Sequence, residues 1–338
     1  MLKNAIIKLT LSESLDRTEA ELAMGEIMDG AATETQIGAF LASLKLKGET
    51  MAEVVGCAQA LRAKAKTVEC GQVQAIDVCG TGGDGPETFN VSTTSAFVIA
   101  AGGVPVAKHG NRAVSSRCGS ADLLEILGIN IHMGPRAVEA CLRETGMTFM
   151  FAPLYHPAMK NAAGPRKELG FRTVFNLLGP LCNPAQVNAQ VVGVCEPELT
   201  ELLAASLAEL GVRHALVVHS QDGLDELSLS APSLVSEVRD RTVSTYVVDP
   251  EQLRLTRATL DQVAGGNPRL NARIFASVLR GEKTPYRDMV LLNSAAGLLV
   301  GGGAGDLPEG IHIAEQAINS GAAWDKYEQV RNLSWELQ

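Results

Sequence analysis

The stretch 75–116 constrains the fold most, because an apolar run in it ends directly in a glycine-rich loop. The apolar run 74–79 fits a short buried strand, the loop 79–85 reads Cys-Gly-Thr-Gly-Gly-Asp-Gly, and 92–101 has the small apolar residues of a helix. Strand, glycine loop and helix form a common anion-binding arrangement. Glycines let backbone N–H groups approach phosphate oxygens closely, and the helix N-terminus adds partial positive charge. This order predicts a phosphate-binding site.

Two better-known glycine motifs do not fit this loop. Gly80, Gly82 and Gly85 match G-x-G-x-x-G, but a dinucleotide-binding fold needs an acidic residue about 20 positions further on. This chain has Lys108 near that place, delivered by a second candidate strand that also brings Arg112 to the same edge. A Walker A loop closes with Gly-Lys-Ser/Thr, which this loop lacks. The site is therefore predicted for a phosphorylated ligand with more negative charge than a nicotinamide dinucleotide.

The rest of the chain predicts an α/β fold behind a small helical domain. Two segments near the N-terminus, beginning at Thr33 and Thr50, have the spacing of a capping box followed by apolar residues at helical intervals. From about Val73, short β-prone runs alternate with helical segments, which indicates a mainly parallel central sheet. We therefore expect a helical domain over 1–70 and an α/β domain over 71–338. The candidate strands are 74–79, 104–107, 148–151, 190–194, 214–219 and 243–248, and the candidate helices between and after them include 121–127, 135–144, 199–210, 271–279 and 287–300.

Composition excludes several classes of protein. The seven cysteines form no C-x-x-C pair, so neither a disulfide framework nor a zinc site is indicated. A formal charge of −9 opposes nonspecific nucleic-acid binding and suits a local basic cluster for a small anion. The sequence has neither a signal peptide nor an uncharged apolar run of about 18 residues, so we expect a cytoplasmic protein that does not bind membranes.

A second candidate site is the acidic pair Asp225-Glu226. It follows the apolar strand 214–219, and ligands of parallel sheets bind beyond the carboxyl ends of the strands. Adjacent carboxylates at such an edge suit Mg²⁺, which prefers oxygen ligands and commonly binds phosphates through one or two carboxylates. The Ser92 hydroxyl is a further candidate ligand. A solvated acidic turn is the other interpretation of the pair.

Several motifs in this order resemble the anthranilate phosphoribosyltransferase family. They are Gly-Thr-Gly-Gly-Asp at 80–84, Phe-Asn-Val-Ser-Thr at 89–93, Lys-His-Gly-Asn-Arg at 108–112, Tyr-His-Pro-Ala-Met at 155–159, Arg-Lys-Glu-Leu-Gly at 166–170, Phe-Asn-Leu-Leu-Gly-Pro-Leu at 175–181 and Gly-Leu-Asp-Glu at 223–226. The resemblance implies transfer of the 5-phosphoribosyl group from phosphoribosyl diphosphate to the amine of anthranilate, with Mg²⁺, in tryptophan biosynthesis. It also implies a nucleoside phosphorylase-like fold in which about 164–188 returns to the helical domain. A homodimer through that domain is implied as well.

The resemblance also assigns site residues. It places phosphoribosyl diphosphate at Gly80, Gly83, Asp84, Thr88, Asn90, Val91, Ser92, Thr93, Lys108, His109, Gly110, Asn111, Arg112, Ala113, Val114, Ser115, Ser116 and Ser120. It places anthranilate at Gly80, Asn111 and Arg166, and the metal ion at Ser92, Asp225 and Glu226.

Lys108, His109 and Arg166 are the candidate catalytic residues. Lys108 would compensate the charge of the departing diphosphate, and the Arg166 guanidinium suits the carboxylate of anthranilate because it forms a bidentate fork. His109 would orient the amine or accept its proton, or would be a structural histidine of the loop. Arg172 is expected at the junction between the domains.

Two other functions remain open from the sequence. A pyrimidine nucleoside phosphorylase shares the implied architecture but needs a nucleobase site and carries a different, lysine-containing glycine loop. A noncatalytic relative that binds nucleic acid through a basic surface is the other alternative, and the acidic net charge argues against it.

Overall fold

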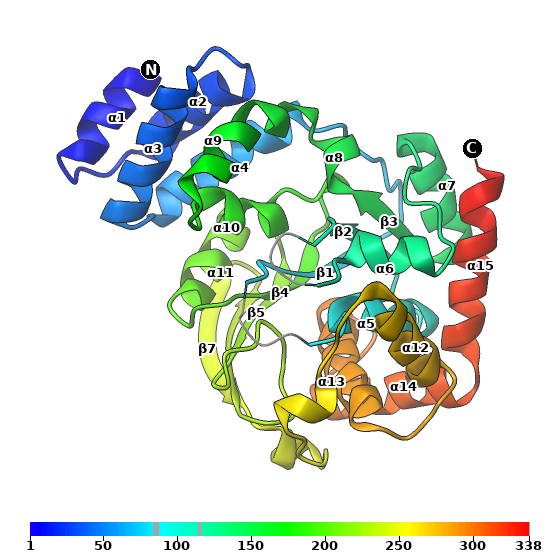
Figure 1. Cartoon of the computed structure of the whole chain (residues 1–338). Helices are drawn as coiled ribbons and strands as arrows, with labels where there is room; N and C mark the ends of the chain where they lie inside the picture. The colour runs from blue at the N-terminus through cyan, green and yellow to red at the C-terminus, as the bar shows by residue number, and fades with distance from the viewer. Residues whose placement is uncertain (84–87, 114–116, 338) are drawn as a thin grey trace.

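The computed structural model describes residues 1–83, 88–113 and 117–337, and it consists of a central sheet with helices on both faces and a group of helices at one end (Figure 1). Four helices open the chain, and both predicted capping boxes are present: the Thr33 and Thr50 side chains accept from the backbone three residues on, and the Gln36 and Glu53 side chains bond back. Asp16 and Glu19 form a third box. The four helices are α1 (Leu2–Thr10), α2 (Arg17–Met28), α3 (Glu34–Lys47) and α4 (Met51–Lys64).

The sheet has seven strands in the order β3-β2-β1-β4-β5-β6-β7. The first five in the chain are parallel to one another, and the last two pair antiparallel. This confirms the predicted mainly parallel α/β fold. The strands are β1 (Ile76–Gly80), β2 (Val106–Gly110), β3 (Met147–Phe151), β4 (Ala189–Gly193), β5 (His214–Ser220), β6 (Ser233–Arg239) and β7 (Thr242–Val248).

All six predicted strands are present, with ends shifted by three residues or fewer, but β6 is missing from the sequence prediction. Ser233, Ser236 and Glu237 interrupt the apolar run of β6, so the segment carries no strong pattern of its own. It becomes a strand because β5 pairs along one edge and β7 along the other.

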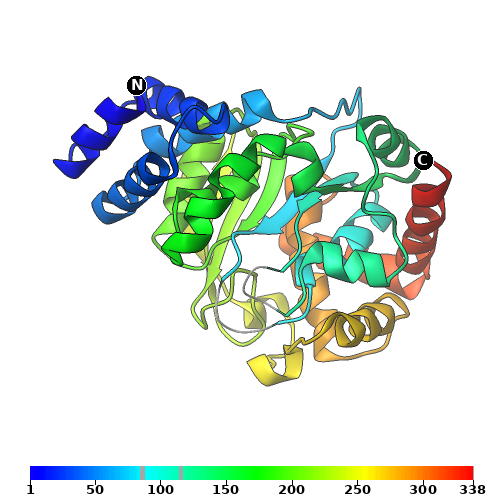
Figure 2. The same cartoon turned by 45° about the horizontal axis from the view of Figure 1, so that its top comes forward.

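Helices cover the two faces of the sheet differently. One core contains the buried residues of α5 (Val91–Ala101), α13 (Pro285–Val300) and the other C-terminal helices. The other core joins the N-terminal helices, α10 (Val174–Leu181) and α11 (Leu199–Glu209) to the opposite face. Figure 2 shows the two layers on either side of the strands. The remaining helices are α6 (Ser120–Ile126), α7 (Pro135–Thr145), α8 (Ala152–Tyr155), α9 (Ala163–Leu169), α12 (Pro268–Leu279), α14 (Leu307–Asn319) and α15 (Ala322–Glu336), with short 3₁₀ turns at Pro157–Ala162, Pro250–Leu253 and Leu260–Val263.

The segment that follows β3 leaves the sheet and lies against the N-terminal helices. The turn Pro157–Ala162 packs on α2 and α4, α9 packs on α3, and α10 packs on α3 and α4. The segment therefore holds α9 and α10 next to the edge of the sheet where the strands end. Among the helices of the described residues, none is long and apolar enough to cross a membrane.

Candidate functional site

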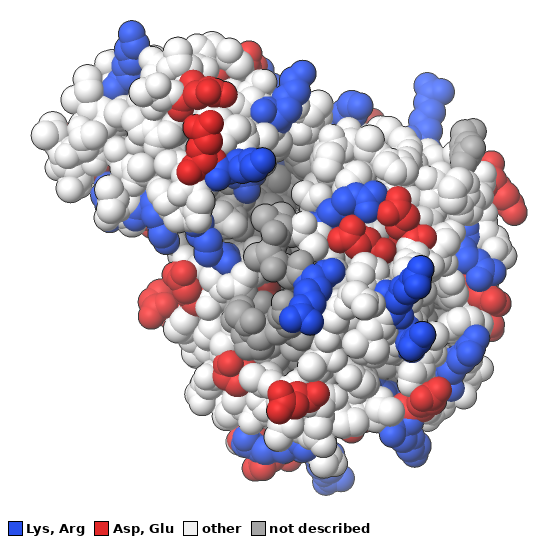
Figure 3. All heavy atoms as spheres, viewed as in Figure 1, with Lys and Arg blue, Asp and Glu red and all other residues white. Residues whose placement is uncertain are grey.

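The site lies at the edge where β1, β2, β4 and β5 end. Parallel strands share this edge, so the loops after Gly80, Gly110 and Ser220 begin close together. In the space-filling view the surface is hollowed between the lobe of N-terminal helices and the rest of the molecule, and Lys and Arg side chains lie on both sides of the hollow (Figure 3).

Asp225 binds the glycine loop. Its Oδ2 accepts a hydrogen bond of 2.9 Å from the Gly82 N–H. A Cβ at Gly80 would lie 2.5 Å from the same Oδ2, and a Cβ at Gly193 would lie 1.6 Å from the Asp225 carbonyl oxygen. A side chain at position 193 would clash with the backbone of the acidic loop, and one at position 80 would displace the Asp225 carboxylate. The two predicted constellations therefore meet at one place.

Glu226 reaches the start of α5. Its Oε1 accepts a hydrogen bond of 3.2 Å from the Ser92 N–H. Ser92, Asp225 and Glu226 thus place one hydroxyl and two carboxylates around the glycine loop and the N-terminus of α5. An all-oxygen set with two carboxylates fits Mg²⁺ held partly by substrate phosphates. Within the described residues, no group of three or more His, Cys, Asp and Glu side chains forms a metal centre by itself.

Lys108 lies inside the protein rather than at the edge. Only 2% of the residue is exposed, and its Nζ donates to the Val78 carbonyl and, at 3.3 Å, to the Ser92 Oγ. The side chain of Lys108 therefore lies behind the edge of the sheet, whereas Arg112 directly follows the end of β2 at that edge. The ammonium lies behind the N-terminus of α5, one hydrogen bond away from a candidate metal ligand.

Asp77 lies on β1, next to the strand that carries Lys108 and His109. Its Oδ1 accepts from the His109 N–H at 3.2 Å, and its Oδ2 accepts from Asn183 Nδ2 at 2.7 Å. Burial raises the pKa of Asp77, while the charge of Lys108 and the hydrogen bond from Asn183 act in the opposite direction. The backbone that begins the Lys-His-Gly-Asn-Arg segment is held in place by this buried carboxyl.

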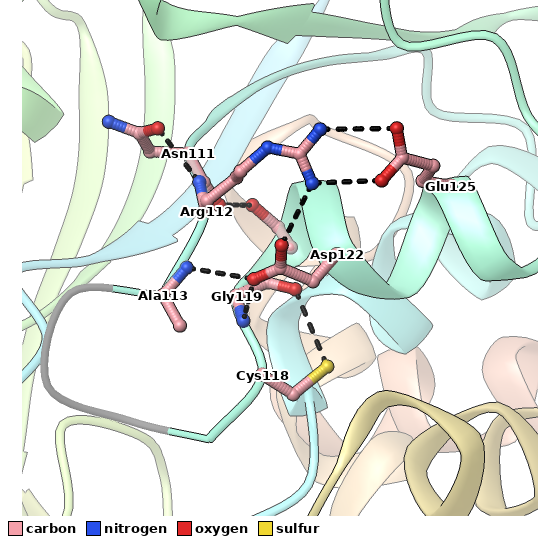
Figure 4. Close-up of polar contacts among 8 residues, drawn as sticks. Asn111, Arg112, Ala113, Cys118, Gly119, Asp122 and Glu125 are labelled. Carbon is pink, nitrogen blue, oxygen red and sulfur yellow. Dashed lines mark hydrogen bonds and ion pairs between the residues drawn. The ribbon is translucent and has the colours of Figure 1, made fainter.

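Arg112 is paired with α6 (Figure 4). Its Nη1 lies 3.0 Å from Asp122 and 2.8 Å from Glu125, and its Nη2 lies 3.1 Å from the other Glu125 oxygen. These carboxylates raise the pKa of Arg112. The Ala113 N–H also donates to Asp122. Arg112 and Ala113 are therefore both joined to α6.

Asn111 and Asn90 hold loops together around the site. The Asn111 carbonyl accepts from the Ser120 Oγ at 3.1 Å. Asn90 donates to the Cys118 carbonyl and accepts from Asn271, both at 2.9 Å. Asn271 is not recognisable from the sequence, because nothing near it in the chain marks it as a partner of the distant Asn90.

The other predicted residues divide into three groups. Val91 and Thr93 lie buried in the first turn of α5, and Thr88 forms an isolated bridge with Ala264. Gly110 ends β2, and Gly83 lies in the glycine loop with a positive φ of 77°. Asp84, Val114, Ser115 and Ser116 lie outside the described residues.

His109 and His156 form a buried pair of rings whose centroids lie 5.1 Å apart. Both Nε2 atoms are buried and have no hydrogen-bond partner in the described part of the chain. Burial and then the neighbouring His156 lower the pKa of His109 to about 3. A ring with so low a pKa is neutral near pH 7 and is a poor proton acceptor.

This low pKa predicts a pH-dependent stability. Between about pH 6.5 and about pH 3 an unfolded chain binds a proton at His109 that the folded chain does not bind, so the free energy of unfolding falls as the pH falls. We expect His109 to contribute about 2 kcal/mol to the decrease between about pH 7.5 and about pH 5. Urea unfolding of His109→Asn should show a correspondingly smaller decrease than the wild type. The exposed His312→Asn should keep the full decrease, and equal decreases in all three proteins would contradict the assignment.

Arg166 lies on α9, half buried, with its guanidinium carbon 4.8 Å from the ring centroid of Phe175 on α10. Burial lowers the pKa of this guanidinium. No hydrogen bond or ion pair joins Arg166 to another described residue, and a half-buried guanidinium stacked on a ring is oriented without being neutralised by a carboxylate.

Arg172 donates a hydrogen bond to the glycine loop. It lies between α9 and α10, and its Nη1 donates to the Gly82 carbonyl at 2.5 Å. It also lines a cavity with residues of α3, α10 and α11, which include Lys45, Asn176 and Leu199. Arg172 thus joins the helical segment to the sheet edge, as expected for the junction.

The comparisons with known proteins cover nearly the whole chain. Residues 3–65 match the helical bundle domain of a glycosyl transferase family, and residues 72–324 match the a/b domain of that family. The anthranilate phosphoribosyltransferase of Acetivibrio thermocellus is 51% identical over 330 residues, which are 97% of this chain and 95% of that protein. The one of Pelotomaculum thermopropionicum is 50% identical over 337 residues, which are 100% of this chain and 98% of that protein.

Solved structures agree with this result. The crystal structure of anthranilate phosphoribosyltransferase from Thermus thermophilus superposes with a TM-score of 0.93 at 42% identity, over 98% of this chain and 99% of that chain. The enzyme from Saccharomyces cerevisiae in complex with PRPP and Mg superposes with a TM-score of 0.90 at 29% identity, over 99% of this chain and 98% of that chain. In sequence, in fold and in the order of its site segments, the chain belongs to the anthranilate phosphoribosyltransferase family.

Proposed function

We propose that this protein transfers the 5-phosphoribosyl group from phosphoribosyl diphosphate (PRPP) to the amine of anthranilate and releases diphosphate, a step of tryptophan biosynthesis. The observation that carries this proposal is the contact between Asp225 and the Gly82 N–H, because it joins a candidate metal ligand to a phosphate-binding loop. The high identity to enzymes of this name over the whole chain supports it.

The residues present fit a magnesium ion at the sheet edge. The Ser92 hydroxyl and the carboxylates of Asp225 and Glu226 would hold it. When bound with PRPP, Mg²⁺ supplies positive charge that stabilises the departing diphosphate.

PRPP is proposed to bind across the glycine loop and the segment 108–120. The backbone N–H groups of the loop and the first turn of α5 provide donors and the partial positive charge of a helix N-terminus. Lys108 adds a full positive charge behind that turn, where low exposure leaves its field poorly screened. Gly80, Gly83, Thr88 and Asn90 belong to the same proposed set, as do Asp84 and 114–116 outside the described residues.

Anthranilate is proposed to bind between Gly80, Asn111 and Arg166. The Arg166 guanidinium matches a carboxylate with two parallel donors, and Phe175 keeps it oriented. An arylamine is already neutral at pH 7, so attack on the anomeric carbon needs no strong base. A neutral His109 agrees with that requirement, since its role is then to line the site rather than to store a proton.

The reaction can be tested directly by following anthranilate fluorescence in purified protein with PRPP and Mg²⁺, leaving out one component at a time. Loss of fluorescence that needs all three, with diphosphate released, is the expected result. Turnover of thymidine or uridine with phosphate instead would identify a nucleoside phosphorylase. No turnover together with salt-dependent DNA binding would identify a noncatalytic relative.

We also propose a cytoplasmic homodimer that forms through the N-terminal helices. Ile7, Leu11 and Leu46 are 59%, 66% and 87% exposed, and they lie on or directly after α1 and α3, which pack together. Light scattering should give twice the chain mass for the wild type and a monomer for Leu46→Glu. Leu270→Glu, on the exposed surface of α12, should stay dimeric, and a dimeric Leu46→Glu would contradict the proposed interface. Cell fractionation tests the proposed cytoplasmic location, and the protein is expected in the cytosolic fraction.

A further inference from the structure

Arg172 contacts the glycine loop from outside the sheet. The loop belongs to the end of β1, whereas Arg172 lies 90 residues further along the chain, between α9 and α10. Its Nη1 donates to the Gly82 carbonyl, and its Nη2 is buried without a hydrogen-bond partner among the described residues. A buried charged donor that lacks a hydrogen-bond partner costs free energy.

The loop sequence is matched to this side chain. Gly83 has a φ of 77°, and a Cβ added there would lie 2.0 Å from Arg172 Nη1. Any residue other than glycine at 83 would therefore be strained and would displace the guanidinium. The second glycine of the pair at 82–83 is explained by Arg172 without reference to a ligand.

Gly82 uses both of its backbone polar groups in the site. Its N–H bonds to Asp225 and its carbonyl accepts from Arg172, so one residue of the loop lies between the acidic loop after β5 and the segment of α9 and α10. Arg166 lies on the same segment, six residues before Arg172. Two hydrogen bonds through Gly82 thus connect the proposed PRPP and metal side of the site to the segment that carries the proposed anthranilate anchor.

We propose that Arg172 is a positioning residue that couples the two substrate sites: phosphate groups bound at the glycine loop stabilise the position of Gly82, and through its hydrogen bond to Gly82 Arg172 stabilises the segment that carries Arg166. The proposal rests on the proposed function. Coupling is reciprocal, so each ligand must tighten the binding of the other by the same factor.

The experiment measures the dissociation constant of anthranilate by fluorescence, with and without magnesium diphosphate, which cannot react with anthranilate. In the wild type we expect tighter anthranilate binding in the presence of magnesium diphosphate. In Arg172→Ala we expect the ratio of the two constants to approach one and the KM for PRPP to rise about tenfold or more. The constant for anthranilate alone should stay within about twofold, since the variant leaves Arg166 in place. Lys167→Ala, an exposed change on α9, should behave as the wild type.

Gly83→Ala provides a second route if Arg172→Ala does not fold, because it displaces the guanidinium without removing it. As a single substitution it should bring the ratio of the two dissociation constants toward one, as expected for Arg172→Ala. The coupling is overturned if magnesium diphosphate does not change the dissociation constant of anthranilate in the wild type. It is also overturned if magnesium diphosphate tightens anthranilate binding as much in Arg172→Ala as in the wild type. Wild-type turnover is measured first, so a failure of the proposed function is recognised separately from a failure of Arg172.

Discussion

Asp225→Asn is expected to lower kcat/KM for PRPP by about 10²- to 10³-fold, the size seen when one preorganised electrostatic stabiliser is removed. An asparagine has nearly the same shape, and its amide oxygen can still accept from the Gly82 N–H, so the loop keeps its position. The negative charge is lost, and with it one of the two carboxylates proposed for Mg²⁺. The half-saturating Mg²⁺ concentration should rise, and the dissociation constant of anthranilate in the free protein should change by less than about twofold.

Steady-state kinetics over a range of Mg²⁺ concentrations check this result. Glu198→Gln is the matched control, because it removes one negative charge from an exposed position next to α11. Glu198→Gln should leave kcat/KM for PRPP and the half-saturating Mg²⁺ concentration unchanged. If Asp225→Asn weakens the use of PRPP and the binding of anthranilate by the same factor, Asp225 and Glu226 do not form a metal site that is separate from the acceptor site.

Arg166→Ala is expected to raise the KM for anthranilate by about 10²-fold while the KM for PRPP changes little. A bidentate guanidinium–carboxylate pair in a half-buried site contributes about 1.5–3 kcal/mol, and its removal leaves the substrate carboxylate without a partner. Phe175, which holds this orientation, stays in place in the variant, so only the guanidinium and its stacking contact are removed.

Arg166→Lys separates charge from geometry. Lysine keeps the charge but cannot form the planar fork, so it should recover only a small part of the lost affinity. Aniline, which lacks the carboxylate, gives a second readout. With aniline as the acceptor, the wild type and Arg166→Ala should have similar KM values for the acceptor. An unchanged KM for anthranilate in Arg166→Ala would remove Arg166 from the acceptor site.

The local patterns of the chain were sufficient for its architecture. Alternating β-prone and helical segments predicted six of the seven strands, because buried parallel strands are short apolar runs that need no distant partner to be recognised. The exception, β6, depends on pairing with β5 and β7. The capping boxes at Thr33 and Thr50 were predictable for the same reason, since all their hydrogen bonds span three residues.

The side-chain contacts of the site were much less predictable. Lys108 and Arg112 are close in the sequence and basic, yet one enters the core beside Ser92 and the other pairs with Asp122 and Glu125 on α6. The low pKa of His109 arises from its burial against His156, which comes from a different segment. These outcomes depend on which side chains other elements bring into contact, and no spacing within a motif records that.

The sequence by itself therefore determined the strand, the glycine loop, the acidic pair and the family, because each of these is written in neighbouring residues. Only the tertiary structure decided how they work together. Gly82 meets Asp225 across 143 positions of the chain and Arg172 across 90. The physical reason is that folding closes these long loops through the packing of the sheet and two separate cores, so the contacts that shape the site are consequences of the whole fold.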